Sequence, residues 1–244
     1  MSTGLTLATA ARVLRQVRTD HRTVALVLVV PCVLVGLLAW MYDGTPVFDR
    51  IGPALLGLFP MVVMFVVTSV ATLRERQSGT LERLLTTPMG KADFMLGYAV
   101  GFGLLATLQA LVVTAFATWV CGLDVAGPLW LLVVAAVLVA VLGTALGLLA
   151  SGFARTEFQA VQFMPGFILP QFLLCGLLVP REDLPDVLRW VSDVLPLSYA
   201  VDAMNEIAVN ADPLPEVLVP VGVVVGFIVV SLALGALTLS RRTP

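Results

Sequence analysis

The chain has 244 residues, of which 59% are hydrophobic and 12% charged, with a formal net charge of −2 at pH 7. Its mean hydropathy of +1.01 excludes an ordinary soluble domain, because one core of this size cannot bury so much apolar surface. Apolar stretches of about 20 residues cross a bilayer as helices, so we expect an all-α membrane protein.

The first predicted element is a helix over residues 5–22. Apolar side chains such as Leu7 and Leu14 recur at helical spacing, while Arg12 and Arg15 lie on another side. This pattern is typical of a helix lying on the inner leaflet with its arginines among the phosphates. The alternative is a basic leader that only orients the first span. The apolar run that follows this helix has no small-x-small cleavage site after it, so we interpret that run as a retained span and not as a cleaved signal.

Six apolar runs predict six transmembrane helices. They cover about residues 23–41, 51–72, 94–120, 128–153, 159–179 and 217–239. With the N-terminus in the cytoplasm, eleven of the fourteen Lys and Arg residues fall on the inside and three outside. Since short cytoplasmic loops retain basic residues, both termini are predicted to be cytoplasmic. Of the fourteen, thirteen are Arg, which suggests a GC-rich genome and hence a bacterial plasma membrane.

A dense charged insert separates the second and third spans, at residues 73–90. Gly79 should end the preceding helix, and Thr80 can cap a short new one that Pro88 limits. This short helix carries an apolar face formed by Leu81, Leu84 and Leu85. A two-turn helix is unstable alone, so we expect it to pack into a groove of a soluble partner. The alternative is a helix resting on the membrane surface.

The loop between the fifth and sixth spans, residues 180–216, is acidic yet rich in apolar side chains. It predicts two short amphipathic helices at the outer interface, at about 185–195 and 197–209. Trp190 and Tyr199 fit the aromatic belt of such an interface. A solvated loop with incidental leucines is the alternative.

Several classes of protein are poorly supported by the sequence. It has no G-x-x-x-x-G-K-[ST] motif, so it holds no nucleotide by a P-loop. The predicted spans carry no Asp, Glu, Lys, Arg or His away from their ends, which argues against an ion-coupled carrier and an intramembrane enzyme. The three cysteines, Cys32, Cys121 and Cys175, show neither pairing nor metal-ligand spacing.

The charged insert resembles one family, the permease subunits of type-2 ABC exporters. The residues that match its R-E-x-x-x-G-T-L-E-x-L-x-x-x-P signature are Arg74, Glu75, Gly79, Thr80, Leu81, Glu82, Leu84 and Pro88. In that family this segment is the coupling helix, which docks on a separate ATPase. The resemblance therefore implies that these eight residues, together with Leu85, dock on an ATP-binding subunit.

A second stretch is similar to the same family, from the fifth span onward. The matching positions are Pro170, Cys175, Gly176, Pro180, Leu184, Pro185, Pro196 and Tyr199. Asn205 departs from the pattern, since many relatives have Arg there, so no salt bridge is carried over for it. Because relatives line their path partly with span five, Gln162 and Phe163 are candidate pathway residues. Interhelical hydrogen bonding is the alternative role for the glutamines of the spans, including Gln109.

Three G-x-x-x-G pairs occur in the predicted spans. They are Gly97/Gly101, Gly143/Gly147 and Gly222/Gly226. Such pairs permit close helix contact, and we expect packing within the chain rather than between chains.

The resemblance implies a drug- or lipid-efflux permease subunit that moves a lipophilic or amphipathic substrate by alternating access. It implies two ATP-binding subunits, which would carry the ATP and Mg, and a second permease chain, identical or homologous. No cofactor, catalytic residue or metal site is expected in this chain, and no nucleic acid partner. A membrane scaffold that recruits another soluble protein and a haem-export-type permease remain as alternatives.

Overall fold

The computed structural model describes residues 3–78 and 90–238, without the side chains of 91 and 92. This part of the chain is helical and contains no strand, which confirms the all-α prediction. The elements in chain order are α1 (Thr3–Thr19), α2 (His21–Met41), α3 (Val47–Gln77), α5 (Lys91–Trp119), α6 (Leu129–Ser151), α7 (Glu157–Leu174), the 3-10 helix η1 (Arg181–Asp183), α8 (Asp186–Asp193), α9 (Pro196–Val209) and α10 (Leu214–Thr238).

Five of the described helices are long and apolar enough to cross a membrane: α2, α3, α5, α6 and α10. They correspond to five of the six predicted spans. The sixth, predicted at 159–179, overlaps α7, which ends at Leu174 and is not among the five. Gln159, Gln162 and Gln171 lower its hydropathy, as do Pro165 and Pro170 within the helix.

Helices α3 and α6 form the centre of the bundle. Their most apolar windows are 67% and 72% buried, against 17% for α2 and 22% for α10. They pack directly through Gly143 and Gly147 of α6. A Cβ atom would lie 2.3 Å from the Met61 carbonyl oxygen at Gly143, and 2.5 Å from that of Phe65 at Gly147. Glycine therefore permits backbone contact here, and this pair packs within the chain as predicted.

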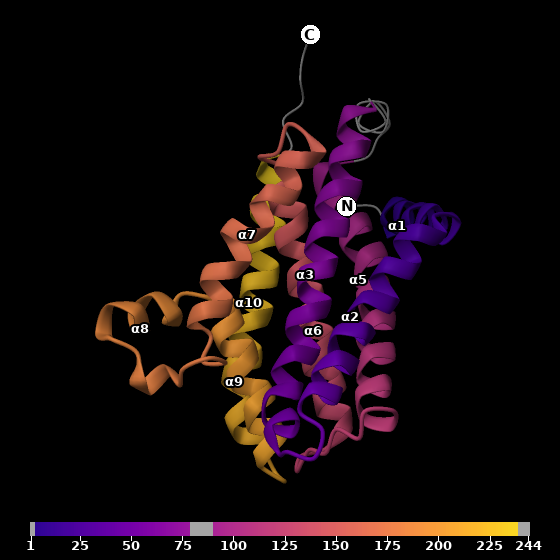
Figure 1. The fold of residues 1–244 in the computed structure, drawn as a ribbon. Helices are drawn as coiled ribbons and strands as arrows, with labels where there is room; N and C mark the ends of the chain where they lie inside the picture. Colours follow the sequence, from indigo (N-terminus) through magenta and orange to yellow (C-terminus); the bar gives the residue numbers. More distant parts are fainter. Residues whose placement is uncertain (1–2, 79–89, 239–244) are drawn as a thin grey trace.

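Helix α1 packs on the first half of α5 and does not merely lie on a membrane surface. The second glycine pair, Gly97/Gly101, receives Thr9 and Val13 of α1, with Cβ positions 2.6 and 3.0 Å from their Cβ atoms. In Figure 1, α1 lies at the right-hand side of the upper half of the bundle, at a steep angle to α5. The third pair differs, because a Cβ at Gly222 or Gly226 meets no described atom within 4 Å. The prediction of packing within the chain is therefore wrong for this pair.

A glutamine of α5 supplies a hydrogen bond that a proline removes from α2. Pro31 has no N–H, so the carbonyl of Val27 one turn earlier loses its helical donor. Gln109, which is fully buried, donates from Nε2 to that carbonyl at 2.8 Å. The interhelical role considered for the span glutamines is thus observed for Gln109.

Helices α7 and α9 meet end to end, with the segment carrying α8 projecting sideways between them (Figure 1). The N-terminus of α9 lacks a side-chain cap of its own, and its Leu197 N–H donates to Gln171 Oε1 of α7 at 3.3 Å. Ser192, at the end of α8, donates to the Leu174 carbonyl at 2.8 Å and lies 3.0 Å from Ser198. These buried polar contacts join the two helices.

The helices expected at 185–195 and 197–209 are present as α8 and α9, but only α8 is exposed. Trp190 of α8 is 74% exposed, whereas most of α9 is buried against α3, α6 and α10. The two helices are thus confirmed, while their position at the outer interface stays a prediction. Small residues such as Ala200 and Ala203 let α9 pack closely into the bundle. Tyr199 is correspondingly half-buried, with its hydroxyl donating to the Asp193 carbonyl at 2.7 Å.

Candidate coupling site

The last turn of α3 connects the bundle to the predicted coupling helix, and we refer to residues 74–78 as the coupling stem. Four consecutive side chains of the stem contact four different parts of the protein. Arg74 contacts the start of α7, Glu75 contacts α1, Arg76 the end of α6, and Gln77 the link between α6 and α7. Successive positions on a helix point about 100° apart, so one turn reaches neighbours on all sides.

Glu75 binds the stem to α1. Its side chain is only 11% exposed and accepts from Arg12 Nη1 at 3.2 and 3.3 Å and from Gln16 Nε2 at 2.9 Å. Arg12 also donates from Nη2 to the Tyr98 hydroxyl of α5 at 2.9 Å, and its guanidinium lies 5.8 Å from the ring centre. A buried carboxylate of this kind needs such donors, because burial without them is costly. The result is a network joining α1, α3 and α5.

Arg74 binds the stem to α7. Its Nε and Nη2 donate to the two carboxylate oxygens of Glu157 at 2.7 and 2.9 Å. Glu157 is the first residue of α7, after the cap Thr156, where the helix dipole also favours an anion. The hydrogen bond from Arg74 lowers the pKa of Glu157, so the carboxylate is ionised at neutral pH. Both side chains of this ion pair are largely exposed, so the pair adds little to the stability of the protein. It does connect the stem to the start of α7.

Arg76 and Gln77 bind the stem to the region that joins α6 and α7. Arg76 donates to the Ser151 carbonyl, at the C-terminus of α6, and Gln77 Nε2 donates to the Arg155 carbonyl at 2.8 Å. The last carbonyls of a helix lack helical donors, and an arginine is a favourable partner for them. The Arg155 N–H in turn donates to Gln159 Oε1 at 2.8 Å. The stem and the α6–α7 link are thus held together.

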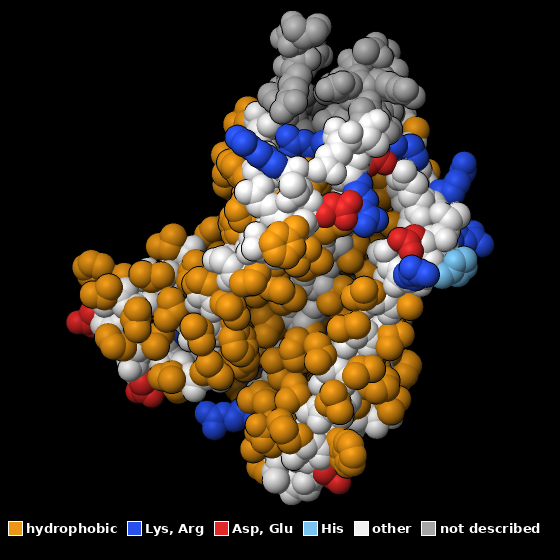
Figure 2. Space-filling model, turned by 45° about the horizontal axis from the view of Figure 1, so that its top comes forward, with side chains coloured by type: hydrophobic (Ala, Val, Ile, Leu, Met, Phe, Trp, Pro, Cys, Tyr) orange, Lys and Arg blue, Asp and Glu red, His pale blue; other side chains and the backbone are white. Residues whose placement is uncertain are grey.

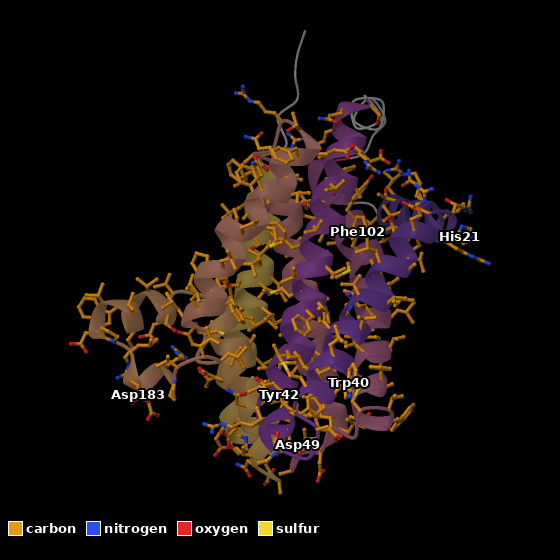
Figure 3. The ribbon with its side chains drawn as sticks, viewed as in Figure 1. His21, Trp40, Tyr42, Asp49, Phe102 and Asp183 are labelled. Carbon is orange, nitrogen blue, oxygen red and sulfur yellow. The ribbon has the colours of Figure 1, made fainter. Side chains whose placement is uncertain are left out.

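A cavity of about 500 Å³ lies beside the stem, between α1, α2, α3 and α5. Its apolar lining includes Val66, Val70 and Phe102. Its charged lining consists of Asp20, Arg74 and Glu75. Figure 3 labels Phe102 at this level of the bundle, below the charged end. The lining is therefore amphipathic, with charged groups next to the stem and aliphatic groups away from it.

Of the nine predicted docking residues, Arg74 and Glu75 are described, and both make contacts inside the chain. The other seven, Gly79, Thr80, Leu81, Glu82, Leu84, Leu85 and Pro88, lie outside the described residues. Docking of an ATPase on this segment stays a prediction. The structure adds that its first two residues hold the stem to the bundle.

The two candidate pathway residues lie on α7. Gln162 is exposed, and Phe163 is half-buried with its ring edge-on to Phe167, 6.5 Å away. Phe163 also packs near Leu73, just before the stem, so α7 brings it close to the coupling region. Gln162 faces away from the described bundle. Their role in a pathway stays a prediction.

The partners of the stem were not predicted from the sequence. Arg12, Gln16 and Glu157 are separated from their partners in the stem by 59 to 83 residues, and Tyr98 is 86 residues from Arg12. Arg12 was interpreted only as part of a basic helix face. No local spacing pattern connects these residues, since their proximity depends on the packing of α1 and α7 against α3.

Comparison with known protein families matches residues 4–209 to the family described as ABC-2 type transporter. The chain is 31% identical over 155 residues to the "Probable multidrug ABC transporter permease YbhR" of Escherichia coli, covering 64% of this chain and 42% of that protein. It is 24% identical over 210 residues to the "Linearmycin resistance permease protein LnrN" of Bacillus subtilis, covering 85% and 54%. "ABC transporter G family member 20" of Dictyostelium discoideum is 26% identical over 196 residues, covering 80% and 27%.

The chain spans about half the length, or less, of these curated relatives. The family match nevertheless covers most of the chain, from α1 through α9, and includes the coupling stem. It agrees with the five apolar helices, which indicate a multi-pass membrane protein and are consistent with a bacterial plasma membrane. The chain therefore belongs to the ABC-2 type transporter family, as the resemblance of its charged insert predicted.

Proposed function

We propose that this chain is the membrane permease subunit of an ATP-driven ABC exporter. A separate ATP-binding subunit, in two copies, docks on residues 79–88 and hydrolyses ATP with Mg. A second permease chain, identical or homologous, completes the transporter. The substrate is a lipophilic or amphipathic drug or lipid, and the names of the bacterial relatives, multidrug and linearmycin resistance permeases, support this class.

The contacts of the coupling stem are the observation that supports this function best. A force applied to residues 79–88 enters the bundle through α5 at one end of the segment and through the stem at the other. There it reaches α1 through Glu75, α7 through Arg74, and α6 through Arg76. One small displacement of the stem therefore acts on several helices together. The energy of ATP binding can drive alternating access only if the helices have two arrangements in which these contacts differ.

The sixth span and the orientation belong to this proposal. With α7 and α9 meeting end to end, the two helices together run from the end of the bundle that holds the stem to the opposite end (Figure 1). They thus act as one broken span, and the chain crosses six times with both ends in the cytoplasm. The exposed side of α7, with Gln162, then faces the second permease chain or the substrate path.

Docking is tested by Leu84→Asp or Leu85→Asp in the full chain. A charge on the apolar face should abolish co-purification of the ATPase while the permease stays folded. Arg83→Gln, in the same segment but outside the nine predicted docking residues, is the matched control and should keep the complex. Retention of the complex and of transport in both Asp variants contradicts the docking proposal.

The role of the stem is tested by Glu75→Gln. The variant loses charge-assisted hydrogen bonds to Arg12, which contribute about 1.5–3 kcal/mol when buried. We expect the ATPase to remain bound while substrate-stimulated ATP hydrolysis and transport fall about tenfold. The exchange Arg12→Glu with Glu75→Arg should restore part of the loss, and Arg15→Gln, which contacts neither, should have no effect. Unchanged coupling in Glu75→Gln argues against the stem as the transmitting element.

A further inference from the structure

A charged cavity lies at the other end of the bundle, away from the coupling stem. It has a volume of about 940 Å³ and is formed by the start of α3, the segment 176–189 and α9. Its apolar wall includes Val47, Ile51 and Val209. Figure 1 shows two of the elements that contribute to its lining, α9 and the projecting segment with α8. A cavity of this size accommodates a whole small ligand.

Arg181 connects two of the segments that line the cavity. It makes ion pairs with Asp193 and Asp202, and its guanidinium lies 5.5 Å from the centre of the Tyr199 ring. Its side chain is 17% exposed, and its Nε is buried without an acceptor among the described residues. This cluster holds the segment 176–189 against α9. It therefore determines the shape of the cavity.

The remaining charges of the lining are not paired with one another. Arg50 and Arg189 line the cavity together with Glu182 and Glu206, and none of the four forms an ion pair within the described part of the chain. Glu206 accepts one hydrogen bond, from Asn210 at 3.0 Å. Guanidinium and carboxylate groups that face one cavity without neutralising each other suit a ligand that carries both signs of charge. A purely cationic or purely anionic ligand would meet repulsion from one of the two sets.

The surroundings of the cavity favour an amphipathic ligand. Val187 and Trp190 of α8 and Val194 at its C-terminal cap are 71%, 74% and 69% exposed. Arg189 and Asp193 of the same helix line the cavity. Figure 2 shows the resulting lobe as a largely hydrophobic surface, with a basic side chain at the notch between the lobe and the bundle. Apolar chains attached to a charged group in the cavity would thus lie against apolar surface.

From these observations we propose that the cavity binds the zwitterionic headgroup of an amphipathic lipid, one that carries a phosphate and an amine. The phosphate lies toward Arg50 and Arg189, and the ammonium toward Glu182 and Glu206. The binding itself needs neither ATP nor a second chain. Only its use as an exit site for exported lipid rests on the proposed function.

The test measures binding of dodecylphosphocholine to the full chain in nanodiscs of phosphatidylglycerol, a lipid without an amine. The double variants Glu182→Gln/Glu206→Gln and Arg50→Gln/Arg189→Gln should each weaken binding about tenfold or more, since two charge-assisted contacts are lost. Two matched controls, Asp183→Asn beside the cavity and Arg15→Gln at the other end of the bundle, should bind as the unmodified chain does. Dodecyltrimethylammonium and dodecyl sulfate should bind more weakly than the zwitterion.

Unchanged affinity in either double variant, or equal binding of the three probes, overturns the proposal. A second arm separates a resident lipid from a transported one, using the permease with its ATPase in vesicles. If the double variants lose both binding and ATP-driven lipid export, the cavity is an exit site; if they lose binding alone, it holds a resident lipid. Failure of ATPase docking leaves the binding result intact, so the two proposals fail separately.

Discussion

The contact between Gln109 and the Pro31 kink leads to a double-mutant prediction. Gln109→Leu leaves the Val27 carbonyl, fully buried beside Pro31, without a donor. An unsatisfied buried carbonyl costs about 1–3 kcal/mol in proteins, and interhelical hydrogen bonds in membranes contribute about 0.6–1.7 kcal/mol. We therefore expect Gln109→Leu to lower the free energy of unfolding by about 1 kcal/mol.

In a Pro31→Ala background the cost should disappear. The introduced alanine supplies the N–H that the Val27 carbonyl needs, so the glutamine is no longer required. Removing Gln109 then also removes its Oε1, which is buried without a partner in the described structure. The coupling energy of the two substitutions should be about 1 kcal/mol, well above zero.

The assay is reversible unfolding in mixed micelles of dodecyl maltoside and sodium dodecyl sulfate, followed by circular dichroism. Gln162→Leu serves as the control, because Gln162 is exposed on α7 and its replacement removes no described hydrogen bond. The reasoning is refuted if Gln109→Leu costs as much in the Pro31→Ala background as in the unmodified chain. It is equally refuted if Gln109→Leu alone costs no more than Gln162→Leu.

Two further stability predictions follow from close contacts. Gly147→Leu should destabilise the bundle by more than about 2 kcal/mol, since its Cβ would lie 2.5 Å from the Phe65 carbonyl oxygen; Gly226→Leu, with open space, is the control, and equal melting temperatures would contradict the packing. Gln171→Leu should cost about 1–3 kcal/mol in the same unfolding assay, because it leaves the buried Leu197 N–H without its acceptor at the start of α9. A cost near zero would mean that another group caps α9.

Local composition was enough to predict most of the helices. Runs of apolar residues indicate the spans because the cost of placing backbone polar groups in hydrocarbon leaves helix as the available form. The charged insert indicated the family because Arg74, Glu75 and the residues after Gly79 form a contiguous pattern. The prediction of six spans rested on the same reasoning. Helix α7 is less apolar than the five candidate spans, because it contains glutamines and prolines.

The contacts that the sequence did not predict join segments that are far apart along the chain. The partners of Glu75, the pairing of Gln109 with the Pro31 kink and the capping of α9 by Gln171 each join residues on separate helices. The mixture of acidic and apolar residues predicted the helix α9, but not that its small residues allow burial against α3 and α10.

The sequence by itself thus determined that this is a membrane protein, where its helices approximately lie and to which family it belongs. These properties follow from the residues of one contiguous stretch of the chain at a time. Only the tertiary structure decided which buried polar groups satisfy one another. It also decided which charges surround a common cavity, as Arg50 and Glu206 do from α3 and α9. The physical reason is that hydrogen bonds and ion pairs require proximity in space, and packing brings together residues that no spacing along the chain connects.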